Sequence, residues 1–411
     1  MRRVVVTGLG AITPLGNDAK TTWERLLKGI SGIDNITSFD TTEHVVKIAG
    51  EVKDFRPDER IPPKTVRRLD RCVQLSLWSA VEAVEDSKID FGKYDPDRIG
   101  VIIGSGIGGL LTWEAEHRKF IEQGPSRVSP FLIPMMISDM TSGYVSIHWG
   151  LKGPNYTTVS ACASGAHAIG EAFRAVKYGD ADVVITGGAE SPITPFAVAG
   201  FSNMKALSRR NDEPQKASRP FDKARDGFVI AEGAATLVLE ELAFAEARGA
   251  RIYCEILGYG ATGDGYHITA PAPEGEGARR SMARSIKEAN CRNEDIDFIN
   301  THGTSTELND KFEARAIKDL FGAHASSLVL NATKSMLGHS LGAAGAVESV
   351  VMILSIRDQI VHPTINLDDP DPECEGLDIV RGESRKVKID YGLSNSLGFG
   401  GHNATLCFKR F

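Results

Sequence analysis

Short runs of β-branched and aliphatic residues alternate with longer segments of helical periodicity along most of the chain. Strands are predicted over 3–7, 98–103, 183–186, 236–239, 298–301 and 328–331. Helices are predicted over 64–87, 164–178, 276–289 and 342–357. Because strands that alternate with helices form a largely parallel or mixed sheet covered on its faces, the pattern predicts an α/β fold.

With 411 residues, the chain is longer than one ordinary domain core supports, so we expect two domains or one duplicated unit. A weak internal similarity favours duplication. Cys162 stands three residues before Gly165, and His339 stands three residues before Gly342. Small residues follow in both places, as needed where helices approach closely. Because alanine- and glycine-rich helices are common in protein cores, this similarity leaves the duplication open.

The composition excludes several classes of protein. With 42% hydrophobic and 25% charged residues, the chain is ordinary and globular rather than disordered. A net charge of -7 argues against nucleic acid as a partner. The six cysteines show no paired spacing, which argues against a zinc site or a disulfide framework. No membrane-spanning run and no signal segment are found, so we expect a cytoplasmic protein that does not associate with membranes.

Cys162 is the strongest candidate nucleophile. The strand-like segment 156–159 leads into Ser-Ala-Cys-Ala-Ser-Gly, and a helix follows. This order places the thiol near a helix N-terminus, where the helix dipole favours a thiolate, so we expect a lowered pKa. Free backbone N–H groups at such a turn also bind a developing oxyanion. The alternative is a buried structural cysteine, the usual environment of a free cysteine.

Two histidines stand at comparable places. His302 follows a predicted strand, at the end where open α/β sheets place ligands, and a loop of hydroxyl residues comes next. His339 lies just before the second small-residue helix, shortly after Lys334. Glu348, on that helix, is expected to pair with Lys334 or to hold a cation. The alternatives are ordinary turn histidines and a surface ion pair of little energetic value.

Two glycine-rich segments require an interpretation. Phe399 is flanked by glycines in 398–401, where a loop can present a backbone N–H and swing the aromatic ring; the alternative is a plain hairpin turn. Residues 104–109 match the GxGxxG pattern after a strand. No βαβ unit with a suitably placed acidic residue follows, so dinucleotide binding is not expected.

In this order, these segments resemble the β-ketoacyl-[acyl carrier protein] synthases, and most closely the elongating synthase II type. The resemblance covers essentially the whole chain and rests on five motifs, 161–165, 300–306, 334–339, 342–345 and 395–401. It implies a thiolase-like five-layer αβαβα fold made of two similar halves, usually as a homodimer. We therefore expect an N-terminal half, 1–250, with the nucleophilic cysteine and a C-terminal half, 251–411, with both histidines.

The resemblance also implies a role for each matching catalytic position. Cys162 would accept the acyl group. His302 and His339 would assist malonyl decarboxylation and bind the thioester oxygen, and Lys334 would be the active-site lysine. The N–H groups of Cys162 and Phe399 would form the oxyanion hole, and the Phe399 ring would gate entry.

Binding positions follow from the same resemblance. The pantetheine arm and the acyl chain would contact Thr304, Thr306, Ile107 and Phe201. A structural monovalent cation, present in some members, would be held by Asn300, Glu348, Ser394 and Asn395. The acidic acyl carrier protein would dock on Lys64, Arg67, Arg68 and Lys205. By pattern alone, the basic face of the 64–87 helix, which also includes Arg71, is equally a solvated surface.

The implied reaction is a decarboxylative Claisen condensation of malonyl-carrier with a cysteine-bound acyl chain, which lengthens a fatty acyl chain by two carbons. It requires a covalent acyl group, imidazole donors and an oxyanion hole, but no metal or nicotinamide. A stand-alone polyketide ketosynthase shares the same triad and stays open as an alternative. A thiolase is disfavoured because 398–401 contains no second cysteine, and a non-catalytic subunit is disfavoured because Cys162 is present.

Overall fold

The computed structural model describes all 411 residues, and eleven of its strands form one hydrogen-bonded run. Along the run the order is β12-β10-β9-β14-β15-β8-β1-β7-β6-β4-β5. The N-terminal half contributes β1 (Val4–Ile12), β4 (Ile99–Gly104), β5 (Asn155–Tyr156), β6 (Val183–Glu190) and β7 (Gly233–Glu241). The C-terminal half contributes β8 (Cys254–Gly263), β9 (Phe298–Asn300), β10 (Val329–Asn331), β12 (Asp378–Ile379), β14 (Tyr391–Gly398) and β15 (His402–Arg410).

Both halves have the same strand topology. The strands of the sheet are numbered here along the chain within each half, leaving out β12. Counted outward from the junction of β1 and β8, the order in both halves is then first, fifth, fourth, second and third, and β12 is an additional strand at one edge. In each half the two inner pairings are antiparallel and the two outer pairings are parallel. The structure therefore confirms the duplication that the internal similarity left open.

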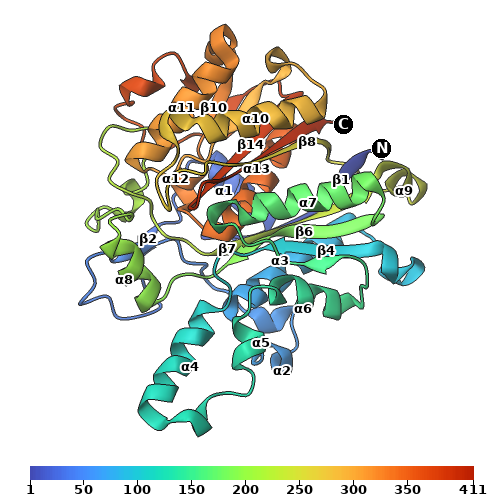
Figure 1. Ribbon diagram of the computed structural model, residues 1–411, viewed down its shortest axis with the longest axis vertical. Coiled ribbons are helices and arrows are strands. Elements are labelled where there is room, and N and C mark those ends of the chain that lie inside the picture. The colour runs from blue at the N-terminus through green and yellow to red at the C-terminus, as the bar shows by residue number, and fades with distance from the viewer.

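Helices divide the molecule into five layers (Figure 1). At the centre, α7 (Ser164–Tyr178) and α13 (Ala344–Asp358) pack against each other and against strands of both halves. The outer face of the N-terminal half-sheet is covered by α3 (Arg71–Ser87). The outer face of the C-terminal half-sheet is covered by α10 (Glu276–Ala289) and α11 (Glu307–Phe321). The predicted αβαβα architecture is confirmed.

The two half-sheets are joined over a short length only. β1 pairs with β7 along its whole length but with β8 only at Val4, Val5 and Val6. The half-sheets can therefore diverge around the central helices. α13 is buried continuously from Ala344 to Ile356, as expected for a helix that is apolar on all sides. The largest core cluster, of 43 buried residues, draws on both halves, so they share one core.

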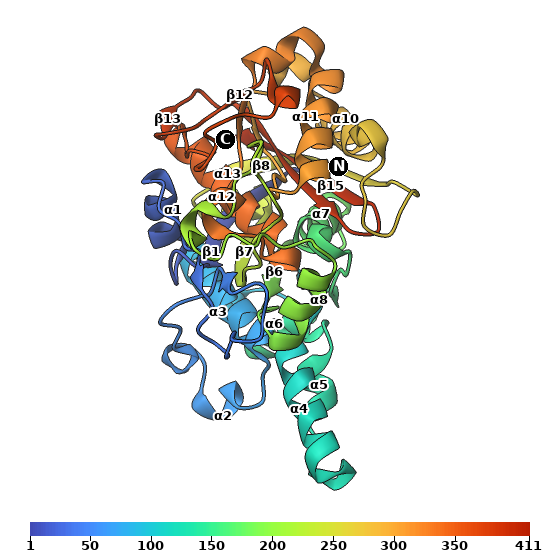
Figure 2. The same ribbon diagram turned by 90° about the vertical axis from the view of Figure 1, so that its left-hand side faces the viewer.

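Shorter elements surround this framework. They are α1 (Ala19–Leu27), β2 (Asp34–Asn35), β3 (Ile48–Ala49), α2 (Pro63–Val66), α4 (Leu110–Gln123), α5 (Leu132–Met136), α6 (Met140–Trp149), α8 (Pro195–Asn203), α9 (Leu242–Ala247), α12 (Lys334–Leu337), β11 (Ile360–Val361) and β13 (Arg385–Lys386). The α4 and α5 segment projects from the body as an arm (Figure 2). No helix has the length and apolar character to cross a membrane.

The single helix predicted over 64–87 is wrong, because the structure has two helices there. α2 ends at Val66, and α3 begins at Arg71 after Asp70, whose carboxylate accepts the Cys72 N–H. The break removes Arg71 from the predicted basic face. Its guanidinium instead forms a bidentate ion pair with Glu232, with both contacts at 2.7 Å.

Candidate active site

The turns that carry Cys162 and His339 occupy equivalent places in the two halves. Each follows the third strand of its half and leads into a central helix. A 3-10 turn precedes each helix, at Ala161–Ala163 before α7 and at Leu341–Ala343 before α13. The duplication therefore brings both turns to one centre between the half-sheets.

The register taken from the sequence similarity is wrong by three residues. α7 begins at Ser164 and α13 at Ala344, so Gly342 corresponds to Cys162 rather than to Gly165. Close packing explains the small residues at these turns. A Cβ on Gly165 would lie 2.8 Å from the Gly342 carbonyl oxygen, closer than real Cβ contacts.

One cavity of about 460 Å³ brings the predicted catalytic side chains together. Cys162, His302, His339 and Phe399 all line it, although they come from distant parts of the chain. The predicted substrate-binding residues and one docking residue also line it, namely Thr304, Thr306, Ile107, Phe201 and Lys205. Lys334 is buried and reaches His302. The cavity therefore collects the sulfur, both imidazoles and the predicted binding positions in one chamber.

His302 is held by charged groups on two helices. The N–H groups of His302 and Gly303 donate to the Glu313 carboxylate at 2.8 and 2.9 Å. Lys334 Nζ donates to the His302 carbonyl at 2.6 Å and lies 3.3 Å from Nδ1. Burial, aided by Lys334 and His339, lowers the pKa of His302 well below its ordinary value. Because an ammonium can only donate, Nδ1 accepts and the proton of the neutral ring lies on Nε2.

The His339 ring is buried without any hydrogen-bond partner at either nitrogen. Its backbone is fixed, since its N–H donates to the Val229 carbonyl at 2.7 Å and its carbonyl accepts the Ala231 N–H at 3.0 Å. The ring lies at 85° to that of His302, with the centroids 5.3 Å apart. Burial and Lys334 lower the pKa of His339 well below its ordinary value. A neutral ring in this position retains one N–H for a substrate oxygen.

Lys334 and Glu348 form a buried ion pair, with Nζ and Oε1 2.5 Å apart. The predicted alternative of a surface pair is wrong, because the two residues are 2% and 1% exposed. Burial raises the pKa of Glu348 to about 7, and Lys334 opposes that rise. The pair fixes Lys334 in contact with His302.

The expected lowering of the Cys162 pKa is wrong. Burial raises the pKa of this thiol to about 12, although Lys334 and the backbone N–H groups of Phe399 and Cys162 act in the opposite direction. The thiol is 7% exposed, so the cost of removing a thiolate from water outweighs the nearby donors. The resting sulfur is therefore protonated.

Phe399 lies at the tip of the hairpin that joins β14 to β15. Gly400 and Gly401, at φ of 83° and 75°, have left-handed backbone conformations that favour glycine. A Cβ on Gly398 would lie 2.8 Å from the Ser160 carbonyl oxygen, so glycine lets the hairpin approach the nucleophile turn. The segment is thus both a hairpin turn and a wall of the cavity.

The loop of Thr304 and Thr306 is held by Arg225, which also lines the cavity. The two hydroxyl oxygens lie 2.9 Å apart. Arg225 donates to the Thr306 and Glu307 carbonyls at 3.1 and 2.8 Å, and forms an ion pair with Asp371 at 2.8 Å. Since all these contacts are buried or half-buried, Arg225 fixes the backbone of the loop.

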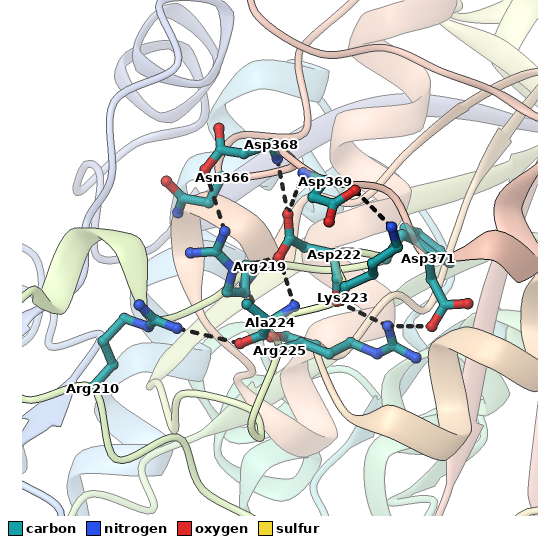
Figure 3. A network of polar contacts seen from close by, with 12 residues as sticks. Arg210, Arg219, Asp222, Lys223, Ala224, Arg225, Asn366, Asp368, Asp369 and Asp371 are labelled. Atoms are coloured by element: carbon teal, nitrogen blue, oxygen red, sulfur yellow. Dashed lines mark hydrogen bonds and ion pairs between the residues drawn. The ribbon is translucent and has the colours of Figure 1, made fainter.

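Arg225 belongs to a wider polar network (Figure 3). Its neighbour Asp222 is buried and accepts the Arg219 guanidinium at 2.9 Å. The same carboxylate accepts the backbone N–H groups of Asp368 and Asp369 at 2.9 and 2.8 Å. The polar segment 208–226 is thereby joined to the C-terminal half.

Arg225→Lys is expected to raise the KM for a substrate that occupies this cavity about tenfold with little change in kcat, because an ammonium cannot bind both carbonyls and Asp371 together. Steady-state kinetics would show this. The control is Arg210→Lys, which alters a half-exposed arginine of the same network. Equal KM values for Arg225→Lys and wild type would contradict the expectation.

Buried oxygens support the predicted cation set in part. Asn300 Oδ1 and Glu348 Oε2 are buried without a hydrogen-bond partner, and Ser394 pairs with Asn300 in the sheet. Such oxygens fit a monovalent cation, which takes oxygen ligands. The Asn395 side chain does not fit, because its amide nitrogen lies 3.1 Å from Glu313 and its amide oxygen accepts the Thr405 hydroxyl at 3.0 Å.

The sequence interpretation missed Asp310 and Glu313. Asp310 accepts the N–H groups of Phe221 and Ser305, and Glu313 holds the backbone at His302. Both carboxylates are buried on α11, on the face that also buries Ala314 and Ile317. Acidic residues within an apolar helical stripe were the signal that could have revealed them.

Comparisons with known proteins agree with this geometry. Residues 1–245 match the family model "Beta-ketoacyl synthase, N-terminal domain", and residues 253–368 match "Beta-ketoacyl synthase, C-terminal domain". A Staphylococcus aureus protein, 3-oxoacyl-[acyl-carrier-protein] synthase 2, is 54% identical over 410 residues, which cover 100% of this chain and 99% of that protein.

Solved structures show the same fold over the full length. A β-ketoacyl synthase from Burkholderia phymatum is 36% identical, with a TM-score of 0.93 and 100% of both chains covered. A structure of a type II polyketide synthase acyl-carrier protein in complex with its ketosynthase matches at 31% identity and a TM-score of 0.91, covering 100% of this chain and 99% of that one. Together with the duplicated fold and the shared cavity, these matches place the chain in the β-ketoacyl synthase family of condensing enzymes.

Proposed function

We propose that this protein condenses malonyl-carrier with an acyl chain held on Cys162, releasing carbon dioxide and lengthening the chain by two carbons. One observation carries the proposal. The Cys162 sulfur, the His302 ring and the unpartnered His339 ring line a single cavity.

The first half-reaction loads the enzyme. The Cys162 sulfur attacks the acyl-carrier thioester, and the carbonyl oxygen becomes an oxyanion held by the N–H groups of Cys162 and Phe399. The bond between the acyl carbon and the carrier sulfur then breaks. Because the Cys162 thiol starts protonated, its proton ends on the departing carrier thiol, so no net charge remains in the dry cavity.

The second half-reaction forms the carbon–carbon bond. The malonyl carboxylate leaves as carbon dioxide, and the electron pair moves onto the thioester oxygen as an enolate. Neutral His302, through Nε2–H, and His339 donate hydrogen bonds to that oxygen. The enolate carbon attacks the acyl-Cys162 carbonyl, and the bond to sulfur breaks. The released thiolate then takes one proton from solvent water, which balances the negative charge that the malonyl carboxylate brought in. Losing one donor of this kind costs about 3–4 kcal/mol of barrier.

The reaction needs no redox cofactor and no catalytic metal. A structural monovalent cation, when bound, would be held by Asn300, Glu348 and Ser394 and would neutralise the free carboxylate oxygen of Glu348. Lys334 supplies a resident positive charge beside His302. The imidazole donors are therefore oriented by groups of the protein.

Fatty-acid elongation is favoured over polyketide assembly. The synthase 2 relative is 54% identical, whereas the polyketide ketosynthase is 31% identical. A series of acyl-carrier primers, incubated with malonyl-carrier and analysed by mass, tests the assignment. A single two-carbon extension per primer is expected. Repeated extension without reduction would favour the polyketide alternative.

We also propose a homodimer joined along β5. This two-residue strand lies at one edge of the sheet, and both of its residues are exposed. Large apolar side chains around it are exposed as well, with Ile147, Tyr156 and Val159 at 65%, 42% and 60%. An unpaired edge with exposed apolar neighbours fits a second copy related by a twofold axis. Sedimentation of the purified protein as a monomer would contradict this.

A cationic surface is available for an acidic carrier protein. Lys64, Arg67, Arg68 and Lys205 are all exposed and make no ion pair within the chain. Arg68 also stacks on Phe131, with its guanidinium 5.0 Å from the ring centroid. Exposed positive charge that is not neutralised within the chain steers an oppositely charged partner. Lys205 lines the cavity and so lies where the carrier arm would enter.

Reversing two of these charges tests the docking surface. Arg67→Glu combined with Arg68→Glu is expected to raise the KM for acyl-carrier about tenfold or more, and the effect weakens at high salt. Turnover of a free pantetheine thioester stays unchanged. Arg279→Glu, an exposed arginine on α10, is the matched control. An unchanged KM for the carrier would remove this surface from the proposal.

A further inference from the structure

Glu190, the last residue of β6, is a fully buried carboxylate without a cationic partner. Its Oε1 accepts the Ser105 hydroxyl at 3.0 Å and the N–H groups of Ile107 and Gly108 at 3.2 and 3.3 Å. Its Oε2 accepts the N–H groups of Gly106 and Gly342 at 2.7 and 3.0 Å. Five donors therefore converge on one side chain.

These donors come from two segments of the active site. Residues 106–108 carry Ile107, which packs in the apolar cluster of Cys162 and lines the cavity. Gly342 lies in the turn between His339 and α13, at the position equivalent to Cys162 in the other half. Glu190 thus links residues 106–108, the Ile107 loop, to the turn between His339 and α13, the His339 turn.

Close approach makes this contact specific. A Cβ at Gly106 would lie 2.8 Å from Glu190 Oε2, and one at Gly342 would lie 2.5 Å from the same atom. The carboxylate fills the space that both glycines leave. Within the GxGxxG pattern of 104–109, the backbone N–H groups of 106–108 are therefore taken by an anion of the protein.

The donor set favours the ionised form of Glu190. All five groups are N–H or O–H donors. If the carboxyl were protonated, its own O–H would face one of these donors, and that donor would lose its acceptor. Burial acts in the other direction and raises the pKa of Glu190. A buried charge satisfied by many donors is costly to disturb, because the loss of one acceptor leaves several buried N–H groups unpaired.

We propose that Glu190 is a positioning residue that holds the Ile107 loop and the His339 turn in one fixed arrangement. The acyl chain and the malonyl group are then bound by two segments that cannot shift independently. The proposal rests on the proposed function for the substrates that it names, but the link between the two segments is a property of the chain alone and can be measured without any substrate.

Glu190→Gln tests the link, since the amide keeps the shape but turns an NH₂ group toward backbone donors. Hydrogen exchange measured by mass spectrometry is expected to show lost protection in both 106–108 and 342, about tenfold or more. Acylation by a long-chain acyl-carrier is expected to slow about 10- to 100-fold, and more than acylation by a short chain. Carbon dioxide release from malonyl-carrier is expected to fall as well.

The matched control is Glu82→Gln. Glu82 is a half-buried carboxylate that also accepts two backbone N–H groups, from Ala11 and Ala19 at 2.8 Å each, but it does not line the cavity. This variant is expected to lose thermal stability while its exchange at 106–108 and its chain-length preference stay unchanged. If both variants changed exchange at 106–108 and chain-length preference to the same extent, Glu190 would be merely structural.

Ser105→Ala provides a milder variant if Glu190→Gln does not fold. It removes one hydroxyl donor to Glu190 and is expected to move exchange and chain-length preference in the same direction by a smaller factor. Unchanged protection at both 106–108 and 342 in the folded variants would overturn the proposal. Failure of the proposed function would instead show in the wild type, as an absent acyl adduct with normal protection at both segments.

Discussion

Cys162→Ala leaves the protein at its unmodified mass after incubation with acyl-carrier, whereas the wild type gains one acyl adduct. Cys162 is the one cysteine that lines the cavity; Cys72, Cys254, Cys374 and Cys407 are buried elsewhere. Without the sulfur no covalent acyl donor forms, so condensation falls about a thousandfold or more. Intact-protein mass spectrometry measures the adduct, and product mass measures condensation.

Two further measurements separate the roles around the sulfur. Cys291→Ala, which removes a half-buried thiol outside the cavity, should keep the adduct and full activity. Cys162→Ala should still release carbon dioxide from malonyl-carrier, because both imidazoles remain in place. An acyl adduct that persists in Cys162→Ala would refute the assignment of the nucleophile.

His302→Ala and His339→Ala should each suppress carbon dioxide release from malonyl-carrier. Each variant removes one donor to the enolate oxygen, and the expected loss is about 100- to 1000-fold. The two losses should not add in the double variant, since both donors serve one oxygen. Carbon dioxide release from a labelled malonyl group measures the step directly.

Acyl loading should be less affected than decarboxylation in both histidine variants, because the oxyanion hole is made of backbone N–H groups. His324→Ala is the control, since that half-buried ring bonds the Ile296 carbonyl and does not line the cavity. Wild-type rates of carbon dioxide release in both cavity variants would remove the histidines from the proposed mechanism.

The predicted strands and central helices match the structure because their signals are local. Runs such as 98–103 and 183–186 alternate with amphipathic or small-residue helices, and the structure has β4, β6 and α7 there. The 64–87 prediction failed because the apolar periodicity of Leu69 and Val73 continues through Asp70, although Asp70 caps a new helix. A capping residue within a periodic stretch is a weak signal against the periodicity.

Site residues were predictable where a reactive residue type stands at the end of a predicted strand or at the start of a predicted helix. Cys162, His302 and His339 each stand at a strand end or a helix start, so their residue type and position both pointed to function. Glu190 and Arg225 act by holding backbone groups of the other half, and no local pattern marks that role. Their partners lie far away in sequence and become neighbours only when the two halves pack together.

Local sequence was sufficient for the fold class and the identity of the reactive side chains, since propensity, periodicity and residue type act over short stretches. Tertiary structure alone decided their protonation and orientation. The pKa of Cys162 is raised, Arg71 forms an ion pair with Glu232, and the Asn395 amide contacts Glu313. These three outcomes depend on desolvation and on partners from other parts of the fold. Such effects are set by what surrounds a group in space, which neighbours along the chain do not reveal.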